Sequence, residues 1–257
     1  MNYFDNEENI IEHLQQTSHR DVLFVNRTLD VQKFFSSLHN PKSFTNWINS
    51  SGKDVQPPDF YSDKYKYMLE VMRIDDYIIG RNSPNALESL FISRVDEERR
   101  QNGLPTIQES NIKLLYIPDM SMASDNGCSI YIDNFKRIVQ KHINKIKTYR
   151  KNHPGYKLGF LIFDESPGYL KVENKKIELK TGEPVNGYCH FYFRDKNLVE
   201  IFMNADIDFV IWATPYKNMA CNPFIYPQVV VFDLKHRGKW KKKLITYNEN
   251  ELQCLEV

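Results

Sequence analysis

Apolar residues recur at helical spacing in several parts of the chain. Residues 6–17 carry them at three- and four-residue intervals, which predicts a helix capped by Asn6. The strongest pattern of this kind covers residues 132–155, with Asp133 in the capping position. Further helices are predicted over residues 31–38, 83–103 and 196–204.

Short apolar runs bounded by turn residues predict the strands. The runs at 158–163 and 229–232 are apolar throughout, which is typical of central strands covered on both faces. Residues 169–180 are polar and predict a hairpin that turns about Glu173, Asn174 and Lys175. Strands are predicted over residues 21–25, 112–117, 157–163, 190–193, 208–213 and 228–234.

Predicted strands and helices alternate, which indicates an α/β fold with a mixed β-sheet flanked by helices. The 257 residues can bury a substantial core, and no repeat, low-complexity tract or linker divides them. We therefore predict a single α/β domain over residues 1–257. A composition of 41% apolar and 26% charged residues is that of an ordered globular protein.

Charge and cysteine usage exclude several classes of protein. The net charge of +1 provides no global field for nucleic acid or membrane, so any such surface must be a local cluster. No window of 18 apolar residues occurs, so no membrane partner is expected. The acidic N-terminus does not resemble a secretory signal, and the four cysteines form no CxxC pair. These features favour a cytoplasmic protein without a zinc site.

The stretch QPPDFYSDKYKYMLEVMRIDD, residues 56–76, predicts a hairpin that carries two acids. If the chain turns at Asp63 and Lys64, then Asp59 lies opposite Met68, and Glu70 is its diagonal neighbour about 7–8 Å away on the same face. Mg²⁺ is often held by one or two carboxylates together with waters and a substrate phosphate. A shift of one residue in the register would move the second acid to the other face.

This hairpin resembles the PD-(D/E)xK superfamily of metal-dependent nucleases in Pro58-Asp59 and Glu70-Val71-Met72. The order of predicted elements is also similar: a helix with acids, a strand, the hairpin, a helix and a strand. The resemblance implies a restriction-endonuclease-like core in residues 1–118. Residues 119–257 would then extend the sheet or bind a partner. The segments PPDF and VMRIDD also resemble those of uncharacterised bacterial proteins, which implies no activity.

For function, the resemblance implies a Mg²⁺-dependent nuclease that cleaves phosphodiester bonds, with Asp59 and Glu70 as metal ligands. It also implies a further acidic ligand from the first helix, Glu8 or Glu12. The family has a lysine that activates water where this chain has Met72, whose thioether carries no charge or transferable proton. Lys66 shares the strand parity of Glu70 and is the substitute predicted for that catalytic role.

Two other acidic sets are alternative sites. Asp164 ends the buried strand at 157–163, and ligands of α/β sheets bind outside the carboxyl ends of strands. Asp208 opens one strand, while Asp233 ends another and is followed two residues later by Lys235. At one end of the sheet these acids would form a metal site. The plainer interpretations are a turn after Asp164 and strand-end acids near solvent.

A basic segment near the C-terminus is the candidate contact for nucleic acid. Lys239 and Lys241 flank Trp240, so the segment can neutralise phosphates and stack on a base. A different class of function remains open on the sequence alone. In this alternative the chain is a non-catalytic bacterial or phage interaction protein with a protein partner, and the hairpin acids only face water.

Overall fold

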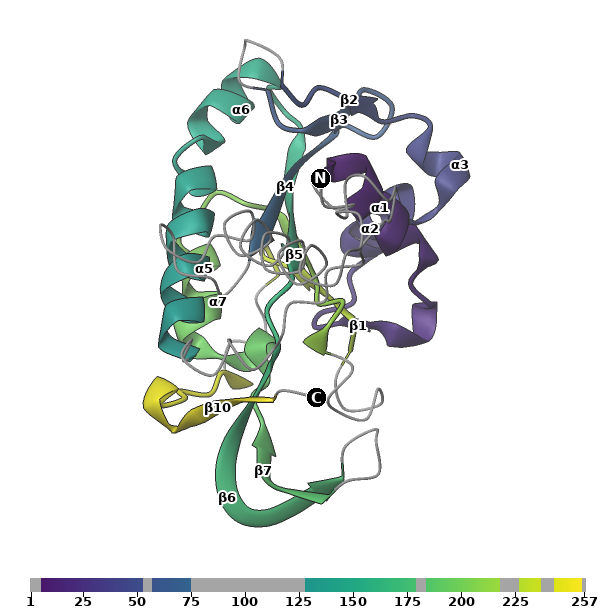
Figure 1. Cartoon of the computed structure of the whole chain (residues 1–257). Helices are drawn as coiled ribbons and strands as arrows, with labels where there is room; N and C mark the ends of the chain where they lie inside the picture. Colours follow the sequence, from purple (N-terminus) through teal and green to yellow (C-terminus); the bar gives the residue numbers. More distant parts are fainter. Residues whose placement is uncertain are drawn as a thin grey trace, which may run out of the picture.

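The computed structural model describes residues 6–52, 57–74, 128–178, 184–217, 227–236 and 243–255, with the backbone alone for 172–178 and 184–186. Helices lie on both sides of a seven-stranded sheet, and a three-stranded sheet lies at one end of the molecule (Figure 1). The predicted α/β class with a mixed sheet flanked by helices is confirmed. The larger sheet runs in the order β1 (Val22–Phe24), β9 (Val229–Asp233), β8 (Phe209–Ala213), β5 (Lys157–Asp164), β4 (Tyr67–Ile74), β3 (Phe60–Ser62) and β2 (Ile48–Asn49).

Strands β4, β5 and β8 are parallel neighbours at the centre of this sheet. On one side β9 runs antiparallel to β8, and on the other the hairpin of β3 and β4 continues into β2. The long connections from β4 to β5 and from β5 to β8 each contain helices, as parallel pairing requires. Strands from both sides of residue 118 therefore share one sheet.

Helices α1 (Glu7–Gln16), α2 (Leu29–His39) and α3 (Pro41–Phe44) lie on one side of the sheet in Figure 1. Helices α5 (Cys128–Ile143), α6 (Ile146–Asn152) and α7 (Lys196–Met203) lie on the other. The predictions for α1, α2 and α7 are confirmed, α2 being longer than expected. The Asn6 side chain accepts a hydrogen bond of 2.9 Å from the Glu8 N–H and caps α1 as predicted.

Residues of the central strands alternate between two apolar cores. In β5, Leu158, Phe160 and Ile162 join the core beneath α5 and α7, while Leu161 and Phe163 join the core beneath α1 and α2. Burial on both faces explains why this strand has no polar alternation. The predicted strands at 157–163, 208–213 and 228–234 are confirmed as β5, β8 and β9.

Two strand predictions within residues 169–193 are wrong. Residues 169–180 do not form a hairpin about Glu173, Asn174 and Lys175, because β6 (Gly168–Glu178) passes through them as one strand. It pairs with β7 (Pro184–Cys189) and β10 (Leu252–Leu255), so partners elsewhere in the chain satisfy its backbone. Residues 190–193 were predicted as a strand, but Tyr192–Arg194 form the 3-10 helix η4, whose aromatic side chains are buried in the core.

The helix predicted over 132–155 is interrupted. α5 already includes Cys128, so Asp133 lies within the helix and the prediction that it is a cap is wrong. A break at Asn144 and Lys145 separates α5 from α6. The apolar stripe continues across this break, with Ile143 and Ile146 both packed on the same core, so residue spacing did not indicate it.

Some predictions concern residues that the structure does not describe: the helix at 83–103 and the strand at 112–117 lie outside the ranges above. Among helices within those ranges, none combines the length and apolar character needed to cross a membrane. Cys128 is a buried free thiol, whereas Cys189 is disulfide-bonded.

A close approach at Gly159 joins α2 to the centre of the sheet. A Cβ atom at this position would lie 2.1 Å from Cζ of Phe34, whose ring also stacks on Phe209 with centroids 4.6 Å apart. We predict that Gly159→Ala lowers the free energy of unfolding by about 1–3 kcal/mol, because the ring is held on both sides. Chemical denaturation should show partial recovery when Phe34→Leu is added; strictly additive losses would contradict the contact.

Candidate functional site

The β3–β4 hairpin brings the two predicted acids onto one face by a different turn from the one expected. The turn is four residues long, Asp63 to Lys66, and Lys66 adopts a positive φ of 56°. The prediction of a two-residue turn is therefore wrong. The change moves the register by two residues, which leaves strand parity unchanged. The observed pairs are Ser62 with Tyr67, Tyr61 with Met68 and Phe60 with Leu69.

Glu70 is buried in β4 beneath α5 and α6, with only 2% of its surface exposed. Its Oε1 accepts hydrogen bonds from the Tyr149 hydroxyl at 2.6 Å and from His142 Nδ1 at 2.5 Å. The ammonium of Lys145 lies 3.6 Å from the same oxygen. The other oxygen, Oε2, is buried and has no hydrogen-bond partner among the described residues. The interpretation that the hairpin acids face water is wrong for Glu70.

Asp59 lies one residue before β3 and extends the hairpin toward Glu70. Its Oδ2 accepts a hydrogen bond of 2.7 Å from the backbone N–H of Val71. Burial and the neighbouring charge of Glu70 raise the pKa of Asp59 to about 7, against the lowering effects of that hydrogen bond and of Lys145. The two carboxyl groups therefore form an electrostatically coupled pair.

The lysine beside this pair is Lys145, not Lys66. Lys66 donates to the Tyr156 hydroxyl at 3.2 Å and lies over that ring. It is four residues from Glu70, or roughly 13 Å along a strand, so the structure does not bring it to the acids. Lys145 arrives from the break between α5 and α6. The sequence signal for it is its spacing of three residues from His142, which places both on one helical face.

Within the described part of the chain, neither acid predicted from the first helix, Glu8 or Glu12, groups with the pair as a third metal ligand. The Glu8 side chain accepts a hydrogen bond of 2.7 Å from the Asn49 amide. Glu7 instead acts on the pair, since its charge contributes to the raised pKa of Asp59.

Glu7 also lines a cavity of about 320 Å³ between α1, α5 and β4. Basic side chains dominate the rest of its polar lining, from Arg73 in β4 and from Arg137, Lys141 and His142 in α5. His142 connects the cavity to Glu70, because it lines the one and bonds the other. The acid pair is thus bordered by a space whose polar lining is mostly basic, with Arg73 already paired to Glu165.

Asp164 is buried at the carboxyl end of β5, and both of its oxygens are occupied. Oδ2 accepts from the Tyr131 hydroxyl at 2.7 Å and from Trp212 Nε1 at 3.0 Å. Oδ1 accepts from the backbone N–H and the hydroxyl of Ser166. The Lys217 ammonium lies 3.4 Å from Oδ2. Asp164 is therefore part of a buried ion pair rather than of a simple turn.

Lys217 is also fully engaged. It is 1% exposed and donates to the Ser166 hydroxyl and, at 3.0 Å, to the Pro167 carbonyl. Its ammonium lies 4.4 Å from the centroid of the Tyr131 ring. These contacts hold the Lys217 side chain between Asp164, Ser166 and Pro167. This cluster connects the end of β5 to the segment that follows β8.

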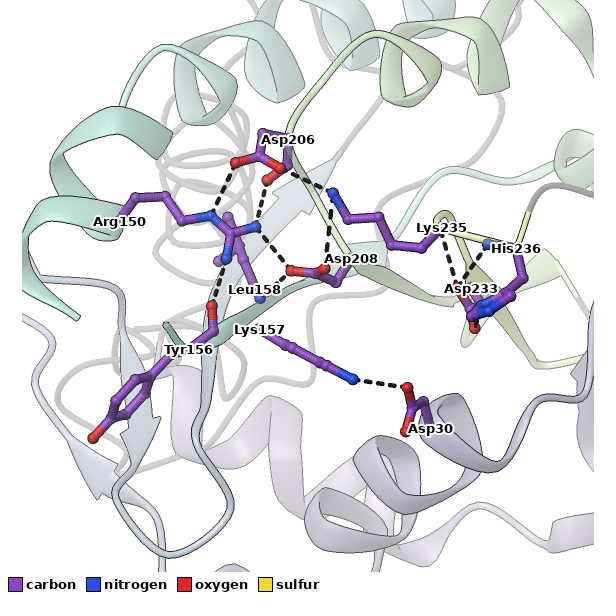
Figure 2. A network of polar contacts seen from close by, with 10 residues as sticks. All are labelled: Asp30, Arg150, Tyr156, Lys157, Leu158, Asp206, Asp208, Asp233, Lys235 and His236. Carbon is purple, nitrogen blue, oxygen red and sulfur yellow. Dashed lines mark hydrogen bonds and ion pairs between the residues drawn. The ribbon is translucent and has the colours of Figure 1, made fainter. Parts of the chain in front are cut away.

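Asp208 lies in a polar network at the opposite end of these strands (Figure 2). Its Oδ2 accepts from Arg150 and from the Leu158 N–H, both at 2.8 Å. Asp206 is bound by the same arginine and by Lys235. Each carboxylate in this part of the network already has a cation partner.

Asp233 lies at the same sheet end as Asp208, as the sequence suggested, and Lys235 contacts both acids in Figure 2, Asp233 through its backbone N–H and Asp208 through its ammonium at 3.8 Å. Oδ1 of Asp233 accepts from the N–H groups of Lys235 and His236, and its Oδ2 accepts from the Thr28 hydroxyl at 2.5 Å. These bonds fix the turn after β9 against the loop before α2. The two acids are thus engaged in holding the fold together.

Within the described ranges, no three His, Cys, Asp or Glu side chains are grouped so as to hold a metal ion. A site at Asp59 and Glu70 would therefore need waters or a substrate to complete it. The predicted nucleic-acid contacts Lys239, Trp240 and Lys241 lie outside the described residues.

Comparison with known proteins gives no family for the chain. No protein-family model matches it, and neither a curated protein nor a solved structure does so.

The raised pKa of Asp59 predicts that the free energy of unfolding falls as the pH rises. In the folded protein its pKa is about 7, against an ordinary value of 3.8. Folding therefore retains a proton between these values, and this contribution to stability is lost as the pH rises through 7. We predict that Asp59→Asn, which keeps an acceptor for the Val71 N–H, is about 2–4 kcal/mol more stable than the wild type at pH 8. Urea unfolding should show this gain vanish near pH 4; an equal gain at both values would contradict it.

The buried ion pair predicts a large loss of stability. Lys217→Met leaves Asp164 without its cation, so the free energy of unfolding should fall by about 3–5 kcal/mol. Lys235→Met is the matched control, because that lysine is 48% exposed in its network and its removal should cost less than about 1 kcal/mol. Urea titration of both variants makes the comparison, and equal losses would refute the distinction.

Proposed function

We propose that the protein is a Mg²⁺-dependent nuclease-like enzyme that cleaves phosphodiester bonds in nucleic acid, with Asp59 and Glu70 as its metal ligands. The observation that carries the proposal is the buried Glu70 Oε2, which has no partner and belongs to a carboxyl group coupled to Asp59. Burying such an oxygen unpaired is costly, and a divalent cation would satisfy it.

The order of elements around the pair supports the proposal. Helix α1, strand β1 and the β3–β4 hairpin follow in the order expected from the PD-(D/E)xK resemblance, with α2, α3 and β2 inserted between β1 and the hairpin. The helix predicted at 83–103 and the strand predicted at 112–117 lie outside the described residues. Asp59 precedes the second strand of this set, and Glu70 lies in the third.

The surrounding residues have distinct roles in this proposal. Tyr149 and His142 hold Oε1 of Glu70, which leaves Oε2 for the metal. When bound, Mg²⁺ would polarise the phosphodiester and make a bound water more acidic. Lys145 would position that water, the role that Met72 cannot take. The basic cavity beside His142 would receive the phosphate backbone.

The proposal also assigns the protein to the cytoplasm, on the sequence ground of dispersed cysteines that form no CxxC pair. The disulfide at Cys189 is the observation that argues against this compartment.

A second candidate is the non-catalytic interaction protein of bacterial or phage type. It is favoured by two exposed leucines near the edge strand β1: Leu23 is 37% exposed and Leu29 is 66% exposed. A protein partner covering them would need no metal and no cleavage.

The test is cleavage of single-stranded DNA, double-stranded DNA and RNA in Mg²⁺ or Mn²⁺. We predict that Asp59→Asn and Glu70→Gln each abolish measurable cleavage. Lys145→Met should slow it by about 10²–10⁴-fold, the range typical of a residue that assists proton transfer. Lys66→Met is the matched control and should cleave as the wild type does.

Calorimetric titration with Mn²⁺ provides the accompanying measurement, with binding expected in the wild type and lost in Glu70→Gln. Cleavage that survives the loss of both acids would reject this site. An absence of both cleavage and metal binding would favour the interaction protein.

A further inference from the structure

Two histidine rings meet in a groove that none of the proposed nuclease residues lines. His19 lies in the short 3-10 helix η2 (His19–Asp21) after α1, and His39 is the last residue of α2. Their ring centroids are 4.4 Å apart at an interplanar angle of 47°. Both line a groove of about 540 Å³, together with Gln15, Ser36 and Lys42 among others.

The ring of His39 is fixed in one orientation and one tautomer. Its Nε2 lies 2.8 Å from the Thr17 carbonyl oxygen. A carbonyl oxygen only accepts, so Nε2 carries the proton and the neutral ring keeps a lone pair on Nδ1. The ring also stacks on Phe35, with centroids 5.0 Å apart. Histidines that bind metals are commonly oriented in this way, by donation from the other nitrogen to a carbonyl.

The ring of His19 has no such engagement. His19 is exposed, and no described residue forms a hydrogen bond with its side chain; its ring contact is with His39. Its nitrogens are therefore free to bind a ligand. Two imidazoles from separate elements converge, one held rigidly and one adjustable.

We propose that His19 and His39 form a binding site for a divalent transition-metal ion such as Zn²⁺, Ni²⁺ or Cu²⁺. Imidazole nitrogen suits these ions, with water completing the coordination. No carboxylate is among the described side chains that line the groove, so the harder Mg²⁺ and Ca²⁺ lack the oxygen ligands they prefer. This site is independent of Asp59 and Glu70.

The site would clip the segment after α1 to the end of α2. Because both ligands converge only in the folded chain, the metal stabilises the folded state by mass action. Lys42 lines the same groove and contributes a positive charge without a metal ligand. Because its charge opposes cation binding, replacing Lys42 provides a control variant within the groove.

The experiment uses the full chain, stripped with EDTA, in calorimetric and thermal titrations with ZnCl₂ at pH 7.5 and with MgCl₂ for comparison. In the double variant Asp59→Asn/Glu70→Gln, which lacks the proposed nuclease site, we predict one Zn²⁺ bound per chain and a higher melting temperature with Zn²⁺. The same variant should show no response to Mg²⁺. His19→Gln and His39→Gln should each weaken Zn²⁺ binding by at least about tenfold. Lys42→Gln should bind Zn²⁺ at least as tightly as the wild type.

Several results would overturn the proposal. The first is no Zn²⁺ binding by the wild type, and the second is undiminished binding in both histidine variants. The third is loss of binding in Asp59→Asn/Glu70→Gln or in His236→Gln, because none of these residues lines the groove. A stabilisation by inorganic phosphate that exceeds that by Zn²⁺ and depends on Lys42 would reassign the groove to an anion. If His39→Gln does not fold, the exposed His19→Gln decides the outcome.

Discussion

A carboxylate buried in an apolar face is the constraint around which this half of the molecule is arranged. Position 70 of β4 lies in the alternation of Met68, Met72 and Ile74, all of which are core residues beneath α5. A charge there costs several kcal/mol unless hydrogen bonds and an opposite charge offset it. Tyr149 and Lys145 from the α5–α6 region supply those contacts. The helix break that positions Lys145 is thus linked to the burial of this carboxylate.

Other buried acids of the protein show what a purely structural solution looks like. Asp164 has both oxygens hydrogen-bonded and a lysine beside it, and Asp208 is held by Arg150 and a backbone N–H. Asp233 likewise bonds through both oxygens. Glu70 differs from these acids because one of its oxygens is buried with no hydrogen-bond partner among the described residues. Since folds rarely leave such atoms unpaired, this difference separates a candidate binding site from an architectural one.

Much of the fold could be predicted from local patterns, and the failures have physical causes. The caps and apolar stripes of α1 and α2 are local signals, and β5 is a continuous apolar run because it is covered on both faces. The prediction that Asp59 and Glu70 share a face depended only on strand parity, so it held although the predicted turn length was wrong. Turn length was not predictable, because Lys66 adopts a left-handed conformation that no glycine or asparagine signalled.

The residues that complete the site could not be predicted from the hairpin, because they belong to a distant part of the chain. A core confined to residues 1–118 would contain Asp59 and Glu70 but not His142, Lys145 or Tyr149. Parallel pairing of β4 with β5 requires a crossover, and the α5–α6 segment is part of it. That crossover places a lysine beside the acids although the strand itself has methionine at the expected position. Sheet topology therefore decides which residues surround the carboxylates, and the spacing of a short motif cannot.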